Sequence, residues 1–282
     1  MPQYTMFTTF SEIVHRSGIE AAARMAVNCG CSSVEILEDA ASGCPRDIND
    51  PVSAAGALQV LRKYGLRTAC YSVCADLYSD REAVESLKRH AEMASALECP
   101  YLHHTVLLRD RQVDSVEETL HRAAEVCAEI AAYAAPLGVT CLYEDQGRFT
   151  NGIVQFGMFY REVQKYCTNV GVCGDIGNTL AVGEAPQDFL RAFADQIRHV
   201  HIKDCCVRLG GECPGPHWNR YGDRWIRDCM VGEGQVDLAA CINVLQEIGY
   251  TGPLSLELSG DMPFAEMARR TQKVIGQLWR TI

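Results

Sequence analysis

A repeating unit constrains the fold of this 282-residue chain more than any other feature of its sequence. In this unit an amphipathic helical stretch ends at a glycine, and a short β-rich run follows. The glycines concerned are Gly30, Gly65, Gly138 and Gly249. A glycine just past a helix readily takes the left-handed conformation that ends it. The pattern therefore predicts helices and strands that alternate along the chain.

Eight β-rich runs occur in the sequence. They cover about residues 4–9, 33–37, 67–73, 100–107, 139–144, 170–175, 198–203 and 253–258. Most begin roughly 27 to 39 residues apart, the size of one strand–helix unit. Strands that alternate with helices at this period indicate a parallel sheet, and eight such units favour a closed (β/α)₈ barrel. An open doubly wound sheet would normally carry a glycine-rich turn after its first strand, and residues 7–10 contain no glycine.

We predict a single barrel domain over residues 1–282, because no linker or low-complexity segment divides the chain. The last interval between β-rich runs exceeds the others by roughly 20 residues, so we expect a long loop insertion at about residues 205–236. This segment contains Arg208, Trp218 and Trp225. Two interpretations stay open: a lid that contacts a substrate, or a solvated excursion that could serve as a contact in a homo-oligomer.

The composition excludes several classes of protein. The net charge is −10, with 36 acidic and 26 basic residues, which argues against nucleic-acid binding. No apolar run approaches the roughly 18 residues of a membrane span, and the start carries no secretory signal. We therefore expect a cytoplasmic protein without a membrane partner. The 15 cysteines form no paired CxxC motifs and are interpreted mostly as small buried hydrophobic residues.

Four candidate metal ligands end four consecutive predicted strands. In a (β/α)₈ barrel the site is built at the C-terminal strand ends, and alternation along each strand would point these four side chains toward the barrel axis. They are Glu144, Asp175, His201 and Glu257. The same alternation assigns His199 to a deeper layer of the barrel. A single strand-end acid is usually solvated or caps a helix, but four together favour a metal site.

Three carboxylates and one imidazole suit a hard divalent cation better than a structural zinc site, which prefers thiolates and histidines. Packed together without a cation, the carboxylates would repel one another. We expect Mn²⁺ first, with Mg²⁺, Co²⁺ or Zn²⁺ as alternatives.

The motifs around these residues resemble the sugar phosphate isomerase/epimerase family, whose fold is a xylose isomerase-like TIM barrel, and within it the ketose and pentulose-phosphate 3-epimerases. The resemblance is carried by the order and spacing of motifs in the C-terminal half and, before it, by Val34-Glu35-Ile36. The motifs are Leu142-Tyr143-Glu144, Gly174-Asp175-Ile176-Gly177-Asn178, His199-Val200-His201-Ile202-Lys203-Asp204, Val231-Gly232-Glu233-Gly234-Gln235-Val236-Asp237 and Gly249-Tyr250-Thr251-Gly252-Pro253-Leu254-Ser255-Leu256-Glu257.

The resemblance implies a divalent metal held by the four ligands and a carbohydrate substrate. It also implies that Glu144 and Glu257 act on opposite faces of a ketose as catalytic acid and base. Removal of the proton α to the carbonyl would pass through a metal-stabilised enediolate, and its return from the other side would give epimerisation. Return to the adjacent carbon would give aldose–ketose isomerisation.

The chain departs from the family pattern at two places. At the position three after Asp175, free-ketose 3-epimerases typically carry His, whereas this chain has Asn178. The resulting Asp-Ile-Gly-Asn sequence is more similar to the pentulose-phosphate 3-epimerases. In the loop after the seventh strand, Val207 stands where those enzymes place a substrate Arg, and Arg208 follows it. The candidate substrate-binding residues are Asn178, His103, Arg208 and Glu35. For His103 a hydrogen-bonded core histidine is an equal alternative, and Glu35 points either inward or toward the helices.

Two further motifs allow other chemistry. Lys203 could form a Schiff base as in an aldolase, although the adjacent Asp204 is a ready salt-bridge partner. Gly232-Glu233-Gly234 could direct backbone N–H groups at an anion or form a plain turn.

The leading hypothesis is thus a metal-dependent sugar or sugar-phosphate isomerase or epimerase. A lyase on the same scaffold, either a dehydratase or a C-glycoside-cleaving enzyme, is the alternative. A non-catalytic sugar-binding barrel is the alternative of another class. A metal endonuclease would need further histidines and a basic face, and neither is evident.

Overall fold

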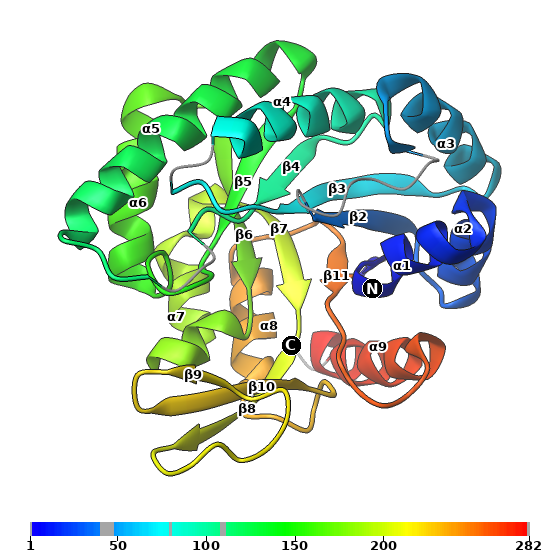
Figure 1. The fold of residues 1–282 in the computed structure, drawn as a ribbon. Helices are drawn as coiled ribbons and strands as arrows, with labels where there is room; N and C mark the ends of the chain where they lie inside the picture. The colour runs from blue at the N-terminus through cyan, green and yellow to red at the C-terminus, as the bar shows by residue number, and fades with distance from the viewer. Residues whose placement is uncertain (1, 40–47, 79–80, 108–110, 281–282) are drawn as a thin grey trace.

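Eight parallel strands close into a barrel in the computed structural model, which describes residues 2–39, 48–78, 81–107 and 111–280 (Figure 1). Around the barrel the strand order is β1-β11-β7-β6-β5-β4-β3-β2. The strands are β1 (Tyr4–Met6), β2 (Ser33–Asp39), β3 (Arg67–Cys74), β4 (Tyr101–His104), β5 (Thr140–Glu144), β6 (Val170–Asp175), β7 (Ile197–Ile202) and β11 (Leu254–Leu256). The predicted (β/α)₈ barrel is therefore confirmed.

Helices surround the barrel on its outer face (Figure 1). They are α1 (Thr8–Ser17), α2 (Ile19–Asn28), α3 (Pro51–Lys63), α4 (Arg81–Ala96), α5 (Val116–Ala134), α6 (Ile153–Tyr166), α7 (Pro186–Ala192), α8 (Leu238–Glu247) and α9 (Phe264–Arg280). The four predicted helix-ending glycines all have positive φ, between 67° and 74°. The first strand is shorter than the predicted residues 4–9, because β1 ends at Met6 and α1 begins at Thr8.

Two different layers fill the molecule. A large apolar core lies between the sheet and the helices, where it includes Phe10, Leu87 and Phe156. Inside the barrel, by contrast, a small apolar cluster of Cys70, Leu142 and Cys173 lies beside buried polar groups. The buried polar side chains of the barrel strands include Glu35, Ser72, His199 and Ser255. A barrel interior that buries this much polarity must satisfy it internally, and these residues form the floor of the site.

The segment expected to be a long loop contains a three-stranded antiparallel sheet of order β8-β10-β9. Its strands are β8 (Asp204–Leu209), β9 (Asn219–Tyr221) and β10 (Arg224–Cys229), and it lies at one edge of the barrel (Figure 1). Only residue 203 separates β7 from β8, so the chain passes almost directly from a barrel strand into the antiparallel sheet. Strand β10 then runs back beside β8. Trp218 packs against the guanidinium groups of Arg208 and Arg227, at 5.7 and 5.2 Å.

The 14 cysteines among the described residues are all free thiols. None of the described helices combines the length and the apolar character that crossing a membrane would require.

Candidate functional site

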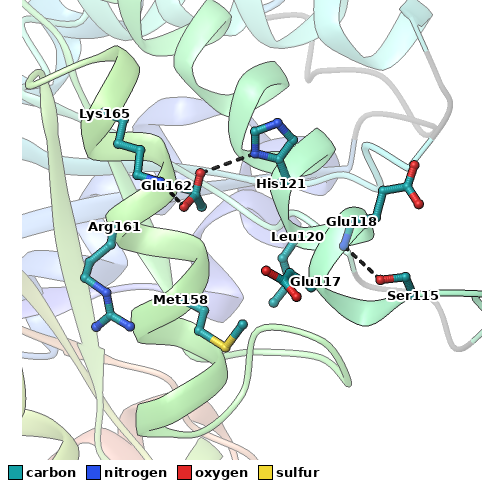
Figure 2. Close-up of a pocket in the computed structure, with 9 residues that line it drawn as sticks. All are labelled: Ser115, Glu117, Glu118, Leu120, His121, Met158, Arg161, Glu162 and Lys165. Atoms are coloured by element: carbon teal, nitrogen blue, oxygen red, sulfur yellow. Dashed lines mark hydrogen bonds and ion pairs between the residues drawn. The ribbon is translucent and has the colours of Figure 1, made fainter.

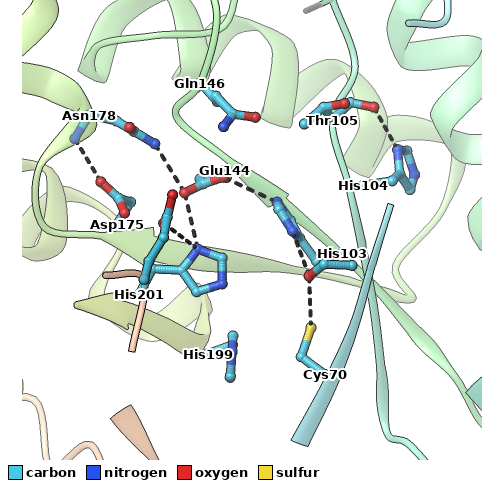
Figure 3. Close-up of polar contacts among 12 residues, drawn as sticks. Cys70, His103, His104, Thr105, Glu144, Gln146, Asp175, Asn178, His199 and His201 are labelled. Atoms are coloured by element: carbon cyan, nitrogen blue, oxygen red, sulfur yellow. Dashed lines mark hydrogen bonds and ion pairs between the residues drawn. The ribbon is translucent and has the colours of Figure 1, made fainter. Parts of the chain in front are cut away.

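Four side chains converge at the C-terminal ends of neighbouring barrel strands. Glu144 ends β5, Asp175 ends β6, His201 lies near the end of β7, and Glu257 follows β11. The potential ligand atoms of all four lie within 4.8 Å of one another. Figure 3 shows Glu144, Asp175 and His201 turned toward one another, with Asn178 and His103 on either side of Glu144.

Strand register explains this convergence. Asp175 on β6 pairs directly with His201 on β7, and His201 pairs with Ser255 on β11. The backbone N–H of Glu257 then donates to the carbonyl of Ile202 at 3.1 Å. Adjacent parallel strands in register place equivalent side chains on the same face. The site thus follows from how the strands align.

The side chains of the cluster are largely withdrawn from solvent. His201 Nδ1 lies 3.2 Å from Glu144 Oε1 and 3.5 Å from Glu257 Oε2. Asp175 Oδ1 accepts hydrogen bonds from the backbone N–H groups of Gly177 and Asn178, at 2.7 and 2.6 Å. Its other oxygen, Oδ2, is buried and finds no hydrogen-bond partner among the described residues. That bare oxygen faces Lys203 Nζ at 3.8 Å.

Electrostatics at the cluster favour an added cation. Burial, together with the carboxylates of Glu144 and Glu257, raises the pKa of Asp175 to about 7, although the Lys203 ammonium opposes the shift. Burial alone would raise the pKa of Glu144, but the imidazoles of His103 and His201 outweigh it and lower that pKa. A bare buried carboxylate oxygen and three crowded carboxylates match the donor set of a hard divalent cation. The residues present therefore fit a metal ion.

Lys203 is part of this cluster, a position that was not predicted from the sequence. Its Nζ lies 2.7 Å from Glu257 Oε1 and donates to Asn178 Oδ1 at 3.2 Å. Its aliphatic chain crosses Gly177 so closely that a Cβ there would lie 2.7 Å from Lys203 Cγ. Burial alone would lower the pKa of Lys203, but Asp175 and Glu257 outweigh it and raise the pKa well above its usual value. A lysine held as an ammonium is a poor Schiff-base nucleophile.

Asp204 is not the partner of Lys203, so the expected salt bridge between these neighbours is wrong. Successive residues of an extended chain point to opposite sides, and Asp204 instead accepts hydrogen bonds from the backbone. The donors are the N–H group of Cys205, at 2.8 Å, and those of Gly232, Gly234 and Val236, at 2.9, 3.0 and 3.1 Å. The anion held at the Gly232–Gly234 turn is therefore a carboxylate of the chain itself, which ties the returning chain to the start of β8.

A cavity of about 100 Å³ opens beside the cluster. The described residues that line it include Glu144, His201 and Glu257 from the cluster, and Phe7, Ser72 and His103 around it. The Phe7 ring stacks on the His201 ring, with centroids 4.8 Å apart. Phe7 and Ser72 were missed from the sequence. Both lie at C-terminal strand ends, and Ser72 shares the inward alternation of Cys70, which was the available signal.

The four candidate substrate-binding residues occupy different places. His103 lines the cavity, and its Nε2 lies 3.3 Å from Glu144 Oε2. Asn178 Nδ2 donates to Glu144 Oε1 at 3.0 Å. Glu35 is fully buried beneath His201 and does not line the cavity. Arg208 lies on β8, where it is exposed, and it is not among the described residues of the lining either.

A larger hollow of about 570 Å³ lies between α5 and α6, and it is lined by residues of these two helices and by Ser115, which precedes α5 (Figure 2). It is lined by charged side chains that pair with each other: His121 Nδ1 lies 3.2 Å from Glu162 Oε2, and Lys165 also contacts Glu162. His121, Glu162 and Lys165 are partly exposed. Exposed ion pairs of this kind are typical of a solvated surface, so the barrel mouth is the stronger candidate site.

Comparison with known proteins places the chain among barrels of one kind. The sequence model of the family described as "Xylose isomerase-like TIM barrel" matches residues 23–278. Two curated proteins named inosose isomerase, from Halalkalibacterium halodurans and Bacillus licheniformis, are each 25% identical over 179 and 182 residues. These matches cover 63% of this chain and 60% of each relative. The chain thus matches three fifths of the length of those relatives.

Two solved structures extend the similarity over nearly the whole chain. D-allulose 3-epimerase from Methylomonas sp., in complex with D-allulose, superposes with a TM-score of 0.75 at 19% identity, covering 98% of this chain and 96% of that one. A xylose isomerase-like TIM barrel protein from Mycobacterium smegmatis, in complex with magnesium, gives a TM-score of 0.72 at 16% identity, covering 99% and 97%. At these identities the two structures establish a shared fold.

Proposed function

We propose, from the premise that this chain belongs to the xylose isomerase-like TIM barrel family, that it is a divalent-metal-dependent isomerase or epimerase of sugars or sugar phosphates. The observation that carries the proposal is the convergence of Glu144, Asp175, His201 and Glu257 beside one cavity. A shared fold does not by itself determine which reaction a protein catalyses. The proposal therefore rests on these four side chains.

The four converging residues would hold the metal, with Mn²⁺ as our first expectation. Asp175 offers its bare Oδ2, and His201 offers Nδ1, which already faces Glu144 and Glu257. When bound, a divalent cation stabilises negative charge that develops on a carbonyl oxygen and its neighbouring hydroxyl. The magnesium complex of the Mycobacterium smegmatis protein supports a metal in this fold.

Glu144 and Glu257 would move the proton. They come from β5 and from the residue after β11, and β6 and β7 separate these strands around the barrel. Their carboxylates therefore approach a bound ketose from different sides. Each carboxylate is oriented by a neutral or cationic partner: Asn178 holds Glu144, and Lys203 holds Glu257. One could remove the proton α to the carbonyl and the other could return one to the opposite face.

Substrate contacts are proposed for two of the four sequence candidates. His103 lines the cavity. Asn178 lies outside the described lining, but it donates to Glu144, which is part of that lining. The positions of Arg208 and Glu35 outside the lining favour other roles for them.

The experiment is a panel of ketoses and ketose phosphates incubated with the metal-loaded protein in D₂O. We expect deuterium at the carbon next to the carbonyl, together with a stereochemical or aldose–ketose exchange. Release of water or of an aglycone would instead identify a lyase. Sugar binding without any exchange, unchanged in Glu144→Gln, would identify a non-catalytic sugar-binding protein and contradict the proposal. Comparing free with phosphorylated sugars would define the substrate class.

A further inference from the structure

The carboxylate of Glu35 is a buried hub beneath the candidate metal site. Four side-chain donors from three other strands converge on it. On Oε1 it accepts from Ser72 Oγ at 2.5 Å and from His201 Nε2 at 3.1 Å. On Oε2 it accepts from His199 Nε2 at 2.7 Å and from Ser255 Oγ. A carboxylate has about four acceptor positions, so this one is fully occupied inside the protein and has none to offer a substrate.

The geometry fixes which ring nitrogen of His201 is available. A neutral imidazole has one N–H donor and one nitrogen with a free lone pair. Because Glu35 can only accept, Nε2 must carry the proton that bonds to it. In the neutral ring the lone pair then lies on Nδ1, which is 3.2 Å from Glu144 Oε1 and 3.5 Å from Glu257 Oε2. These two oxygens are also acceptors, so a metal cation between them and Nδ1 would take the place of a proton there. Phe7, stacked on the same ring, restricts its rotation.

The hub also reaches the other side of the cavity. Ser72 gives its only hydroxyl proton to Glu35, so its oxygen can only accept from His103 Nδ1, which lies 3.0 Å away. This bond fixes the ring so that Nε2, which carries the lone pair in a neutral imidazole, lies 3.3 Å from Glu144 Oε2. One carboxylate therefore orients a histidine on β7 directly and a histidine on β4 through a serine.

We propose that Glu35 is a positioning residue, which holds His201 with Nε2 protonated so that Nδ1 is presented to the metal. The inference rests on the proposed function, because it assumes that the cluster above Glu35 binds a divalent cation. It replaces the expectation that Glu35 contacts the substrate. When a carboxylate accepts a hydrogen bond from the second nitrogen of a ligand histidine, its mutation typically weakens metal binding by about 10- to 100-fold.

The test compares three proteins by calorimetric titration of Mn²⁺ after removal of bound metal with a chelator. The variants are Glu35→Gln and, as a matched control, Glu38→Gln on the same strand. Glu38 is also buried, but among the described residues its ionic contact is His15, at 3.8 Å. We expect Glu35→Gln to bind Mn²⁺ about 10- to 100-fold more weakly, and Glu38→Gln to bind it like the wild type. Equal affinity in all three would overturn the role of Glu35 while leaving the metal site standing.

A wild type that binds no metal would overturn the proposed function and, with it, this inference. A second measurement needs no variant of Glu35, in case Glu35→Gln does not fold. Long-range ¹H–¹⁵N spectra of the Zn²⁺-loaded wild type report which ring nitrogen of each histidine carries a proton, and His201→Ala identifies the signals of His201. We expect a protonated Nε2 and a metal-bound Nδ1. A metal-bound Nε2 would overturn the proposal.

Discussion

Lys203 Nζ lies 2.7 Å from Glu257 Oε1, so a buried ammonium occupies one side of a cluster of three carboxylates. Its positive charge offsets part of the repulsion among Glu144, Asp175 and Glu257. This relationship has consequences for stability that depend on whether a metal is bound.

Replacing Lys203 by Met should destabilise the metal-free protein strongly, because it leaves buried carboxylates without a partner. Removing one member of a buried ion pair typically costs about 3–5 kcal/mol. Added Mn²⁺ should restore part of this loss, so the gain in stability on metal binding should be larger in Lys203→Met than in the wild type. Urea unfolding with chelator and with Mn²⁺ measures both terms. Lys165→Met, at an exposed pair, is the control, and equal unfolding free energies of Lys203→Met and wild type in chelator would contradict the prediction.

Gly177→Ala should also disturb Lys203. The added Cβ would lie 2.7 Å from Lys203 Cγ and 3.1 Å from Cys205 Sγ, and overpacking of this kind costs about 1–3 kcal/mol. Gly56→Ala in α3 is the matched control, because a Cβ there meets nothing within 4 Å. In a helix interior this change should stabilise by about 0.5–1 kcal/mol. Thermal unfolding checks the opposite signs, and a shared sign would contradict the account.

We expect the folded protein to lose stability in mild acid because of His104. Burial lowers the pKa of His104 to about 4; the hydrogen bond from Nδ1 to the carbonyl of Thr105 opposes this shift, and His103 adds to it. Buried Nε2 has no acceptor for a second proton among the described residues. The unfolded chain takes up that proton near pH 6.5. Stability from this group is therefore present above pH 6.5 and is lost as the pH falls toward 4, by about 3 kcal/mol in all.

The measurement is urea unfolding between pH 7.5 and 4.5 in chelator, which removes any contribution of metal. His104→Gln should show a flatter pH dependence than the wild type, whereas His15→Gln, at a half-exposed residue, should not. Parallel curves for His104→Gln and wild type would show that another group governs the acid sensitivity.

Glu144→Gln and Glu257→Gln should each lower the rate of α-proton exchange while leaving the fold intact. General acid–base groups typically contribute about 10²- to 10⁴-fold to a rate, and an amide cannot take up the proton. Deuterium incorporation into the active ketose, followed by NMR, measures the loss. Glu12→Gln on the exposed side of α1 should keep the wild-type rate. Retention of that rate by Glu144→Gln would remove the carboxylate from the mechanism.

Much of the architecture could be predicted because it depends on patterns among residues that are close in the sequence. The spacing of β-rich runs and the helix-ending glycines carry the barrel, and alternation along single strands brings Glu144, Asp175 and His201 to one face. The antiparallel sheet within residues 205–236 was not predicted, because β8 and β10 pair across the chain and their sequences give no strong alternation.

The contacts that orient the site depend on distant residues. Glu35 meets His199, His201 and Ser255, which are 164 to 220 positions away in the chain. Lys203 pairs with Glu257 rather than with its neighbour Asp204, because the backbone N–H groups of the Gly232–Gly234 turn hold Asp204. These contacts depend on the order of the strands around the closed barrel. That order cannot be read directly from a single sequence.

The most direct test of the central claim is a calorimetric titration of Mn²⁺ into the metal-free wild type and into His201→Ala. We predict one Mn²⁺ per chain for the wild type and lost or much weaker binding for His201→Ala, with both proteins folded by circular dichroism. Absence of binding to the wild type, or equal binding to the two proteins, would contradict a metal site built on Glu144, Asp175, His201 and Glu257.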